Sequence, residues 1–216
     1  SQRFVSRFGT CDLALYVGCQ AKETQAKLSK LGIGEDSKEM DRYTLLVSML
    51  PRGKYPFGRE VLLPNNIAEL IGFLLAPIGV SWSPTSRFQV LPSSGEYQTL
   101  VQPAQNAVIF DLRKPGRQAV DQILKDWHQL MKDGYEYAGV DVPLSEPGLG
   151  NLYDILAKNG FFISGFVPYH YSSTLGIRMQ SIGPTKVAWD DIRVFAPHAR
   201  KLLKVVRNNY ERNRLL

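Results

Sequence analysis

The sequence predicts an α/β fold with mixed sheets, because segments of strand-like and helix-like apolar spacing alternate along the chain. The strongest helical signal covers residues 116–132, where apolar side chains recur every three or four positions and form one stripe. Buried strands are indicated on either side of it, at residues 106–112 and 137–144, which are short apolar runs bounded by turn residues. This alternation favours helices packed on the faces of a sheet.

The first part of the chain carries the same two kinds of signal. Residues 12–18 and 42–50 have the apolar character of strands, and residues 21–31 between them predict a compact helix that ends at Gly32. Another short strand is expected at residues 59–63. A helix with one buried face follows, and its apolar positions are Ile67, Leu70, Ile71, Leu74, Leu75 and Ile78.

The last part of the chain predicts a short helix, two strands and a terminal helix. Apolar residues at helical spacing begin at Leu152, and Gly160 stops this helix because glycine accepts the left-handed conformation that follows a helix end. Strands are expected at residues 161–167 and 175–180. Residues 197–214 predict an amphipathic helix whose apolar face comprises Ala199, Leu202, Leu203, Val206 and Tyr210.

A weak internal repeat suggests how the chain is organised. The order strand, short helix, glycine, strand occurs in residues 12–50 and again in residues 137–180. The strand and long helix that precede the second copy have no counterpart before the first, so the first copy is expected to be partial. The predicted division is a partial first unit at 1–83, a polar linker at 84–104, a second unit at 105–183 and a basic helical extension at 184–216.

Composition and charge narrow the class of protein. The 216 residues have a net charge of +6, and residues 186–216 alone carry 8 basic and 3 acidic groups. The basicity therefore belongs largely to the C-terminal segment rather than to the main surface of the fold. No apolar run reaches the length of a transmembrane helix. Cys11 and Cys19 show neither a disulfide framework nor a metal spacing, which predicts free thiols in a cytoplasmic protein.

The second unit resembles the GNAT-type acyltransferase superfamily, whose members depend on acyl-CoA. The matching stretches are NAVIFDLRKPGRQAV, YAGVDVPL, LAKNGFFISGFVP and LGIRMQ, in the superfamily's order of strand, long helix, strand, short helix and two closing strands. The run VPLSEP…NGFFISGFVP…LGIRMQ is most similar to GNAT-like domains that stand beside anti-sigma-factor-type ATPase modules in bacteria. The resemblance covers most of residues 10–182. It implies acetyl-CoA or another acyl-CoA as co-substrate, and transfer of an acyl group to an acceptor amine that the sequence does not identify.

The resemblance also implies where the cofactor would bind. In this superfamily the pyrophosphate lies on a glycine-rich turn between a strand and the following helix, where backbone N–H groups face it. The equivalent residues are Arg113, Lys114, Gly116, Arg117 and Gln118. They supply one glycine, a helix start and three cations, but not the full glycine spacing. The alternative interpretation is an exposed basic turn that only connects the strand to the helix.

No catalytic constellation emerges from the sequence, and the catalytic residues are left unknown. The position where the superfamily often has an acidic tyrosine is Leu156 in the second unit and Leu28 in the first, while Tyr153 lies one turn earlier. Asp141 ends a strand and is equally suited to capping a loop. The three histidines show no ligand spacing, so no metal site is predicted.

Two other functional classes remain open. The chain could be a non-catalytic regulatory or protein-interaction module that keeps the GNAT fold and has lost the cofactor turn. It could also bind nucleic acid through the basic C-terminal helix, since phosphate contacts need only clustered lysine and arginine. A basic helix docked on its own domain is the commoner arrangement, so nucleic acid is not expected, and no membrane contact is expected either.

Overall fold

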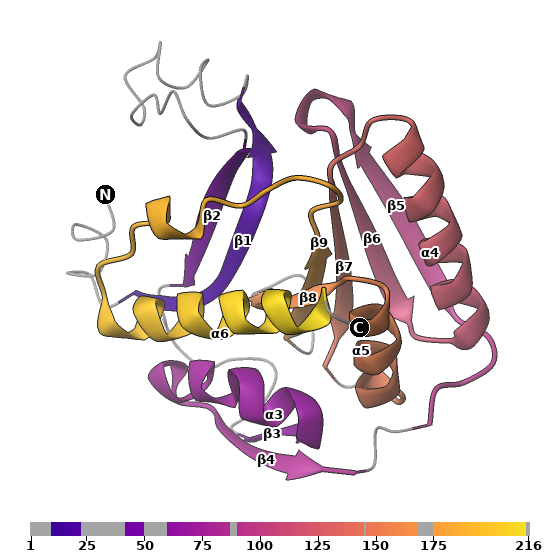
Figure 1. Ribbon diagram of the computed structural model, residues 1–216. Helices are drawn as coiled ribbons and strands as arrows, with labels where there is room; N and C mark the ends of the chain where they lie inside the picture. The colour runs from indigo at the N-terminus through magenta and orange to yellow at the C-terminus, as the bar shows by residue number, and fades with distance from the viewer. Residues whose placement is uncertain are drawn as a thin grey trace.

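The computed structural model describes residues 10–22, 42–49, 60–86, 90–144, 146–167 and 175–214. Its main element is a seven-stranded sheet with the strand order β2-β1-β8-β9-β7-β6-β5 (Figure 1). The strands are β1 (Cys11–Ala21), β2 (Arg42–Met49), β5 (Glu96–Gln102), β6 (Ala107–Lys114), β7 (Tyr137–Pro143), β8 (Phe162–Val167) and β9 (Gly176–Ser181). The predicted α/β class with a mixed sheet is confirmed.

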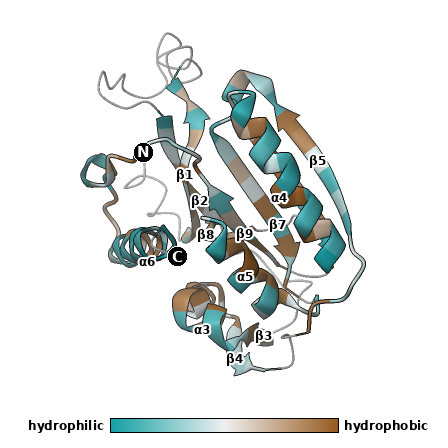
Figure 2. Ribbon diagram, turned by 45° about the vertical axis from the view of Figure 1, so that its right-hand side comes forward, coloured by the Kyte–Doolittle hydropathy of each residue, from teal (hydrophilic) through white to brown (hydrophobic). Residues whose placement is uncertain are grey.

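The second half of the chain follows the predicted order of elements. Strand β6 leads into α4 (Arg117–Lys132), which returns the chain to β7 in parallel with β6. Helix α5 (Leu149–Lys158) comes next, and β8 and β9 then pair antiparallel, with β9 also antiparallel to β7. Helix α4 buries the predicted stripe, including Val120, Ile123 and Trp127, against the sheet (Figure 2).

The strands assigned to two predicted units lie in one sheet. The antiparallel pair β1–β2 joins the other strands at β8, where Ala14 pairs with Gly165. Gly165 has a φ of +130°, and a Cβ atom there would stand 2.2 Å from the carbonyl oxygen of Leu13. Only glycine permits this close approach of the two backbones. The predicted helix at residues 21–31 and the position Leu28 lie, after Lys22, outside the described residues.

Residues 60–86 form a small layer of their own below the sheet (Figure 1). Strands β3 (Glu60–Pro64) and β4 (Ser81–Thr85) pair in parallel and are connected by α3 (Asn65–Ile71). The prediction of one continuous helix through Ile78 is wrong, because two short 3-10 turns replace the α-helix after Ile71. Gly72 begins the first of them against the ring of Trp82, and Pro77, which has no N–H group, lies in the second.

The range 84–104, predicted to be a linker, contains regular structure. Residues 96–102 form β5, which pairs antiparallel with β6 at the end of the described sheet. Side chains of β5 are mostly exposed, and Leu100 is 59% exposed. The polar composition that suggested a linker therefore reflects a solvent-facing strand rather than an unstructured connection.

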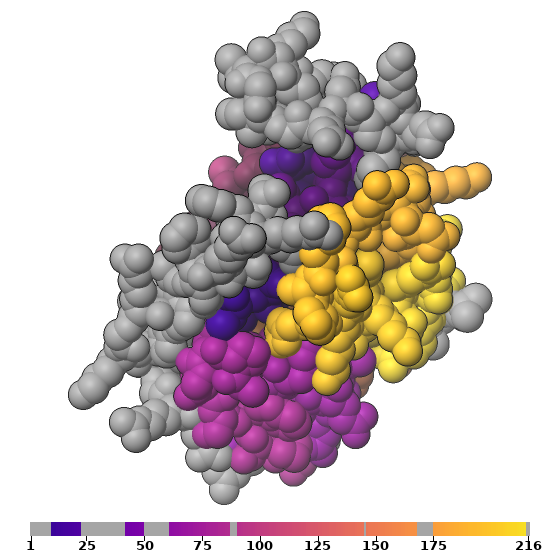
Figure 3. Space-filling view, turned by 90° about the vertical axis from the view of Figure 1, so that its left-hand side faces the viewer, coloured from indigo at the N-terminus to yellow at the C-terminus, as the bar shows by residue number. Residues whose placement is uncertain are grey.

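The C-terminal helix packs on the sheet as predicted. Helix α6 (Pro197–Asn213) lies across β8 and β1 and buries Leu202 and Val206, whereas Leu203 is half-buried. Figure 3 shows α6 in yellow directly above residues 60–86 in magenta, so that these two parts of the chain share one surface. Its polar side chains also fix it in place, because Asn209 Oδ1 accepts a hydrogen bond of 2.8 Å from the backbone N–H of Ile163.

Replacing Asn209 with leucine should destabilise the protein by about 1–3 kcal/mol, because the buried N–H group of Ile163 would lose its acceptor. The matched control is Asn208→Leu, which lies one position away on the exposed side of α6 and should cost little. Urea unfolding of the two variants measures the difference. Equal midpoints for both variants would show that the Asn209 contact does not secure the helix.

Candidate functional site

The predicted cofactor turn lies where β6 ends and α4 begins. Gly116 precedes the helix in an extended conformation, and the helix starts at Arg117. The first N–H groups of a helix have no partner within the helix and carry about half a positive charge, which makes them a common site for anions. The turn therefore has the local geometry that the sequence predicted.

Two of the N–H groups at this helix start, however, already have partners within the protein. The N–H group of Arg117 donates to the carbonyl oxygen of Pro92 at 2.7 Å, and that of Gln118 donates to the carbonyl oxygen of Ser93 at 3.0 Å. Residues 90–95, in the connection that leads to β5, lie against the helix start. We call these residues the covering segment. Its carbonyl groups accept from two N–H groups of the kind that bind anions at a helix start.

Close backbone contacts leave no room between the covering segment and the turn. A Cβ atom on Gly116 would stand 2.0 Å from the carbonyl oxygen of Ser94, and one on Gly95 would stand 2.4 Å from that of Lys114. The other end of the segment reaches α5, because Leu91 lies against Gly148, the residue before that helix. The covering segment thus extends from the start of α5 to the start of α4.

The basic side chains of the turn are paired with nearby polar groups. Arg113 donates to Asp111 at 3.0 Å and to Gln98 at 3.1 Å. Lys114 lies 2.7 Å from Glu96, and this hydrogen bond raises the pKa of Lys114. Arg117 contacts Asp121 at 3.1 Å. These pairs are exposed and individually weak, but together they cancel much of the positive charge that the sequence assigned to the turn.

Leu156 occupies the position where the superfamily often has an acidic tyrosine, and Tyr153 lies one turn earlier. Neither residue places an acidic hydroxyl at the cofactor turn. Leu156 is fully buried in the core. The hydroxyl of Tyr153 points toward α6, where it accepts hydrogen bonds from Asn209 at 2.7 Å and from Arg212 at 2.6 Å. The sequence could not reveal this, because Asn209 and Arg212 lie 56 and 59 residues further along the chain.

Asp141 does not cap a loop but belongs to a buried ion pair. Its two carboxylate oxygens each accept a hydrogen bond of 2.6 Å from Arg178, and its side chain is only 1% exposed. The guanidinium group of Arg178 also lies over the ring of Tyr16 at 4.2 Å. Burial by itself lowers the pKa of Arg178, but the hydrogen bonds to Asp141 together with the electrostatic attraction of Asp141, Tyr137 and Tyr16 raise it above its ordinary value. The pair joins β7 to β9 next to it in the sheet.

Two groups near this pair, the hydroxyl of Tyr16 and the thiol of Cys19, have pKa values above their ordinary values. Burial raises the pKa of Tyr16 to about 12 and that of Cys19 to about 11, from ordinary values of 10.0 and 9.0. Between these values the folded chain keeps protons that the unfolded chain has released. The free energy of unfolding should therefore fall as pH rises from about 9 to about 12.

Urea unfolding at pH 7.5 and at several values above 9 measures this loss. Tyr16→Phe removes the titrating hydroxyl but keeps the ring beneath Arg178, so its stability should fall less steeply with pH. A parallel fall in both proteins would assign the alkaline loss to other groups.

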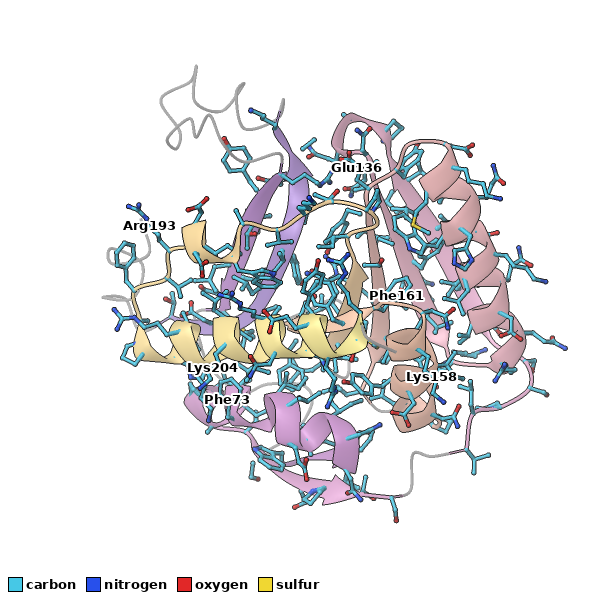
Figure 4. All side chains as sticks on the ribbon, viewed as in Figure 1. Phe73, Glu136, Lys158, Phe161, Arg193 and Lys204 are labelled. Carbon is cyan, nitrogen blue, oxygen red and sulfur yellow. The ribbon has the colours of Figure 1, made fainter. Side chains whose placement is uncertain are left out.

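The basic helix α6 uses several of its cations within the protein. Arg207 pairs with Asp190 and Glu211, Arg212 donates to Tyr153, and Lys201 lies over the ring of Phe73 at 4.2 Å. Lys204 is exposed on the same helix and is labelled in Figure 4. These contacts are those of a helix docked on its own domain, which is the arrangement that the sequence favoured over nucleic-acid binding.

Comparison with protein-family models, with curated proteins and with solved structures gave no match. Across the described ranges, histidine, cysteine and acidic side chains nowhere gather in a group of three that could hold a metal ion. In the same ranges, none of the helices has the length and apolar character needed to cross a membrane.

Proposed function

We propose that this chain is a non-catalytic regulatory or protein-interaction module with an acyltransferase-like fold. The observation that carries the proposal is the hydrogen bonding of the Arg117 and Gln118 N–H groups to the carbonyl groups of Pro92 and Ser93. In the acyltransferases that the sequence resembles, such N–H groups bind the pyrophosphate of CoA. Here the protein's own backbone takes that place.

The order of elements supports the likeness of fold, whereas the details of the turn weigh against the activity. Strands and helices from β6 to β9 occur in the order that the resemblance implies. Acyl transfer to an amine, which the sequence favoured first, would need an accessible phosphate turn and an acid or base near the acyl group. The turn is covered, the hydroxyl of Tyr153 faces Asn209 and Arg212 of α6 rather than the turn, and Asp141 is paired with Arg178.

The test is a calorimetric titration with CoA and with acetyl-CoA. No saturable binding of either compound is expected up to about millimolar concentration, a limit that corresponds to a binding free energy weaker than about −4 kcal/mol. The double variant Arg113→Glu, Arg117→Glu is titrated beside the wild-type protein. Saturable binding by the wild type that the double variant loses would overturn the proposal and restore the acyl-CoA-binding function.

A further inference from the structure

A second site, which shares no lining residue with the cofactor turn, lies between α3, α5 and α6. A cavity of about 460 Å³ opens there, within the size range of small-molecule sites. Its polar lining comes from α3, α5 and α6, which are far apart in the sequence. The lining residues are Asn66, Glu69, Leu70, Tyr153, Asp154, Ala157, Lys158, Arg212 and Asn213.

A buried acceptor in the wall of this cavity has no partner. The side chain of Asn213 is oriented by its Nδ2 group, which donates to the carbonyl oxygen of Phe161 at 2.7 Å. Its Oδ1 atom is buried and has no hydrogen-bond partner among the described residues, and the residue as a whole is only 3% exposed. A buried acceptor without a donor is costly, so a donor group on a ligand would be favoured beside it.

Tyr153, which lines the same cavity, can donate a hydrogen bond to a ligand. Its hydroxyl oxygen accepts from both Asn209 and Arg212, so both of its acceptor positions are used and its own proton is left to donate. That proton has no acceptor among the described residues. A ligand that brings an acceptor to Tyr153 and a donor to Asn213 would satisfy both groups.

The charges that line the cavity are balanced. Lys158 and Arg212 are positive, whereas Glu69 and Asp154 are negative. Within the described residues Lys158 and Glu69 make no ion pair. Lys158 lies at the end of α5, close to Phe161 and the end of α6 (Figure 4). A ligand with a single charge would meet a repelling group here, whereas a small ligand that carries both charges would not.

We propose that this cavity binds a free amino acid. The carboxylate of the ligand is held by Arg212 and Lys158 with the hydroxyl of Tyr153, since guanidinium and ammonium groups are the usual partners of carboxylates. The ammonium group of the ligand donates to Asn213 Oδ1, Glu69 and Asp154. Because the cavity is separate from the covering segment, the inference does not depend on whether the turn binds CoA.

The experiment titrates the wild-type protein with each of the standard L-amino acids, and with acetate and methylamine as ligands of one charge. Binding is followed by calorimetry and by the rise in Tm. At least one amino acid should bind saturably in the millimolar range or below, and about tenfold or more tightly than either single-charge compound. Failure of every amino acid at about 10 mM, or equal binding of acetate, would overturn the proposal.

Variants of exposed residues locate the bound ligand. Lys158→Gln with Arg212→Gln should weaken the best amino acid by about tenfold or more, since two charged hydrogen bonds are lost. The control Lys204→Gln removes an exposed cation from α6 outside the cavity and should leave the affinity within about twofold. Circular dichroism confirms that all variants are folded. Equal affinities of the double variant and the control would place the ligand elsewhere and overturn the assignment.

Discussion

Replacing Asp141 with alanine is expected to lower the free energy of unfolding by about 3–5 kcal/mol, the largest effect of any single change considered for this protein. The cost arises because the charge of Arg178 would remain in the sheet without its partner. The carboxylate is 1% exposed and the guanidinium group 12% exposed, so little water can replace the lost contact. Urea unfolding followed by circular dichroism measures the change.

A matched control separates burial from charge alone. Asp121 also pairs with an arginine, but its side chain is 44% exposed, so Asp121→Ala should cost less than about 1 kcal/mol. The double variant Asp141→Leu, Arg178→Met removes both charges and should recover much of the stability lost by Asp141→Ala. A small loss for Asp141→Ala, comparable to that of Asp121→Ala, would contradict the assignment of a strong buried pair.

Gly116→Ala is expected to have the second largest effect, a destabilisation of about 3 kcal/mol. The added Cβ atom would stand 2.0 Å from the carbonyl oxygen of Ser94, so the covering segment must move away from the turn. The backbone conformation at Gly116 is extended and suits alanine, and the cost therefore comes from the contact alone. Gln118→Ala, an exposed change in the same turn, is the matched control and should be nearly neutral.

Hydrogen exchange tests the contact between the covering segment and the turn at individual backbone N–H groups. The N–H groups of Arg117 and Gln118 should exchange slowly in the wild-type protein, because they donate to Pro92 and Ser93. In Gly116→Ala they should exchange much faster, while N–H groups in the middle of α4 stay protected. Fast exchange of these two N–H groups in the wild type would show that the turn is open in solution.

The sequence predicted best those helices and strands whose apolar spacing lies within a single segment of the chain. The stripe of α4 and the apolar strands around it depend on spacing within a single segment, and they appear where expected. The interrupted helix after Ile71 was less predictable, since the apolar spacing continues through Gly72 and Pro77 while the backbone does not. Proline within a helical pattern was the available signal.

The candidate site depended on contacts between distant segments. Arg113, Lys114 and Arg117 were correctly placed at a helix start, but nothing local shows that residues 90–95 cover it. The polar composition of residues 90–95 predicted a linker. The sequence alone does not show that backbone carbonyl groups of such a segment accept hydrogen bonds from a helix start elsewhere in the chain. The Asp141–Arg178 pair had a clearer signal in the sequence, since each residue is the one charged side chain of its strand.

The position of β8 has a consequence for the order in which the protein folds. The antiparallel pair β1–β2 near the beginning of the described chain can join the sheet only when Gly165 is available to pair with Ala14. Such pairing between distant residues makes folding slow, because a long loop must close before the contact forms. During synthesis β1 and β2 would emerge before β8, and one edge of β1 would stay unpaired in the meantime. Until β8 and α6 have been synthesised and have packed against β1, this edge is the part of the sheet most exposed to incorrect strand pairing and to aggregation.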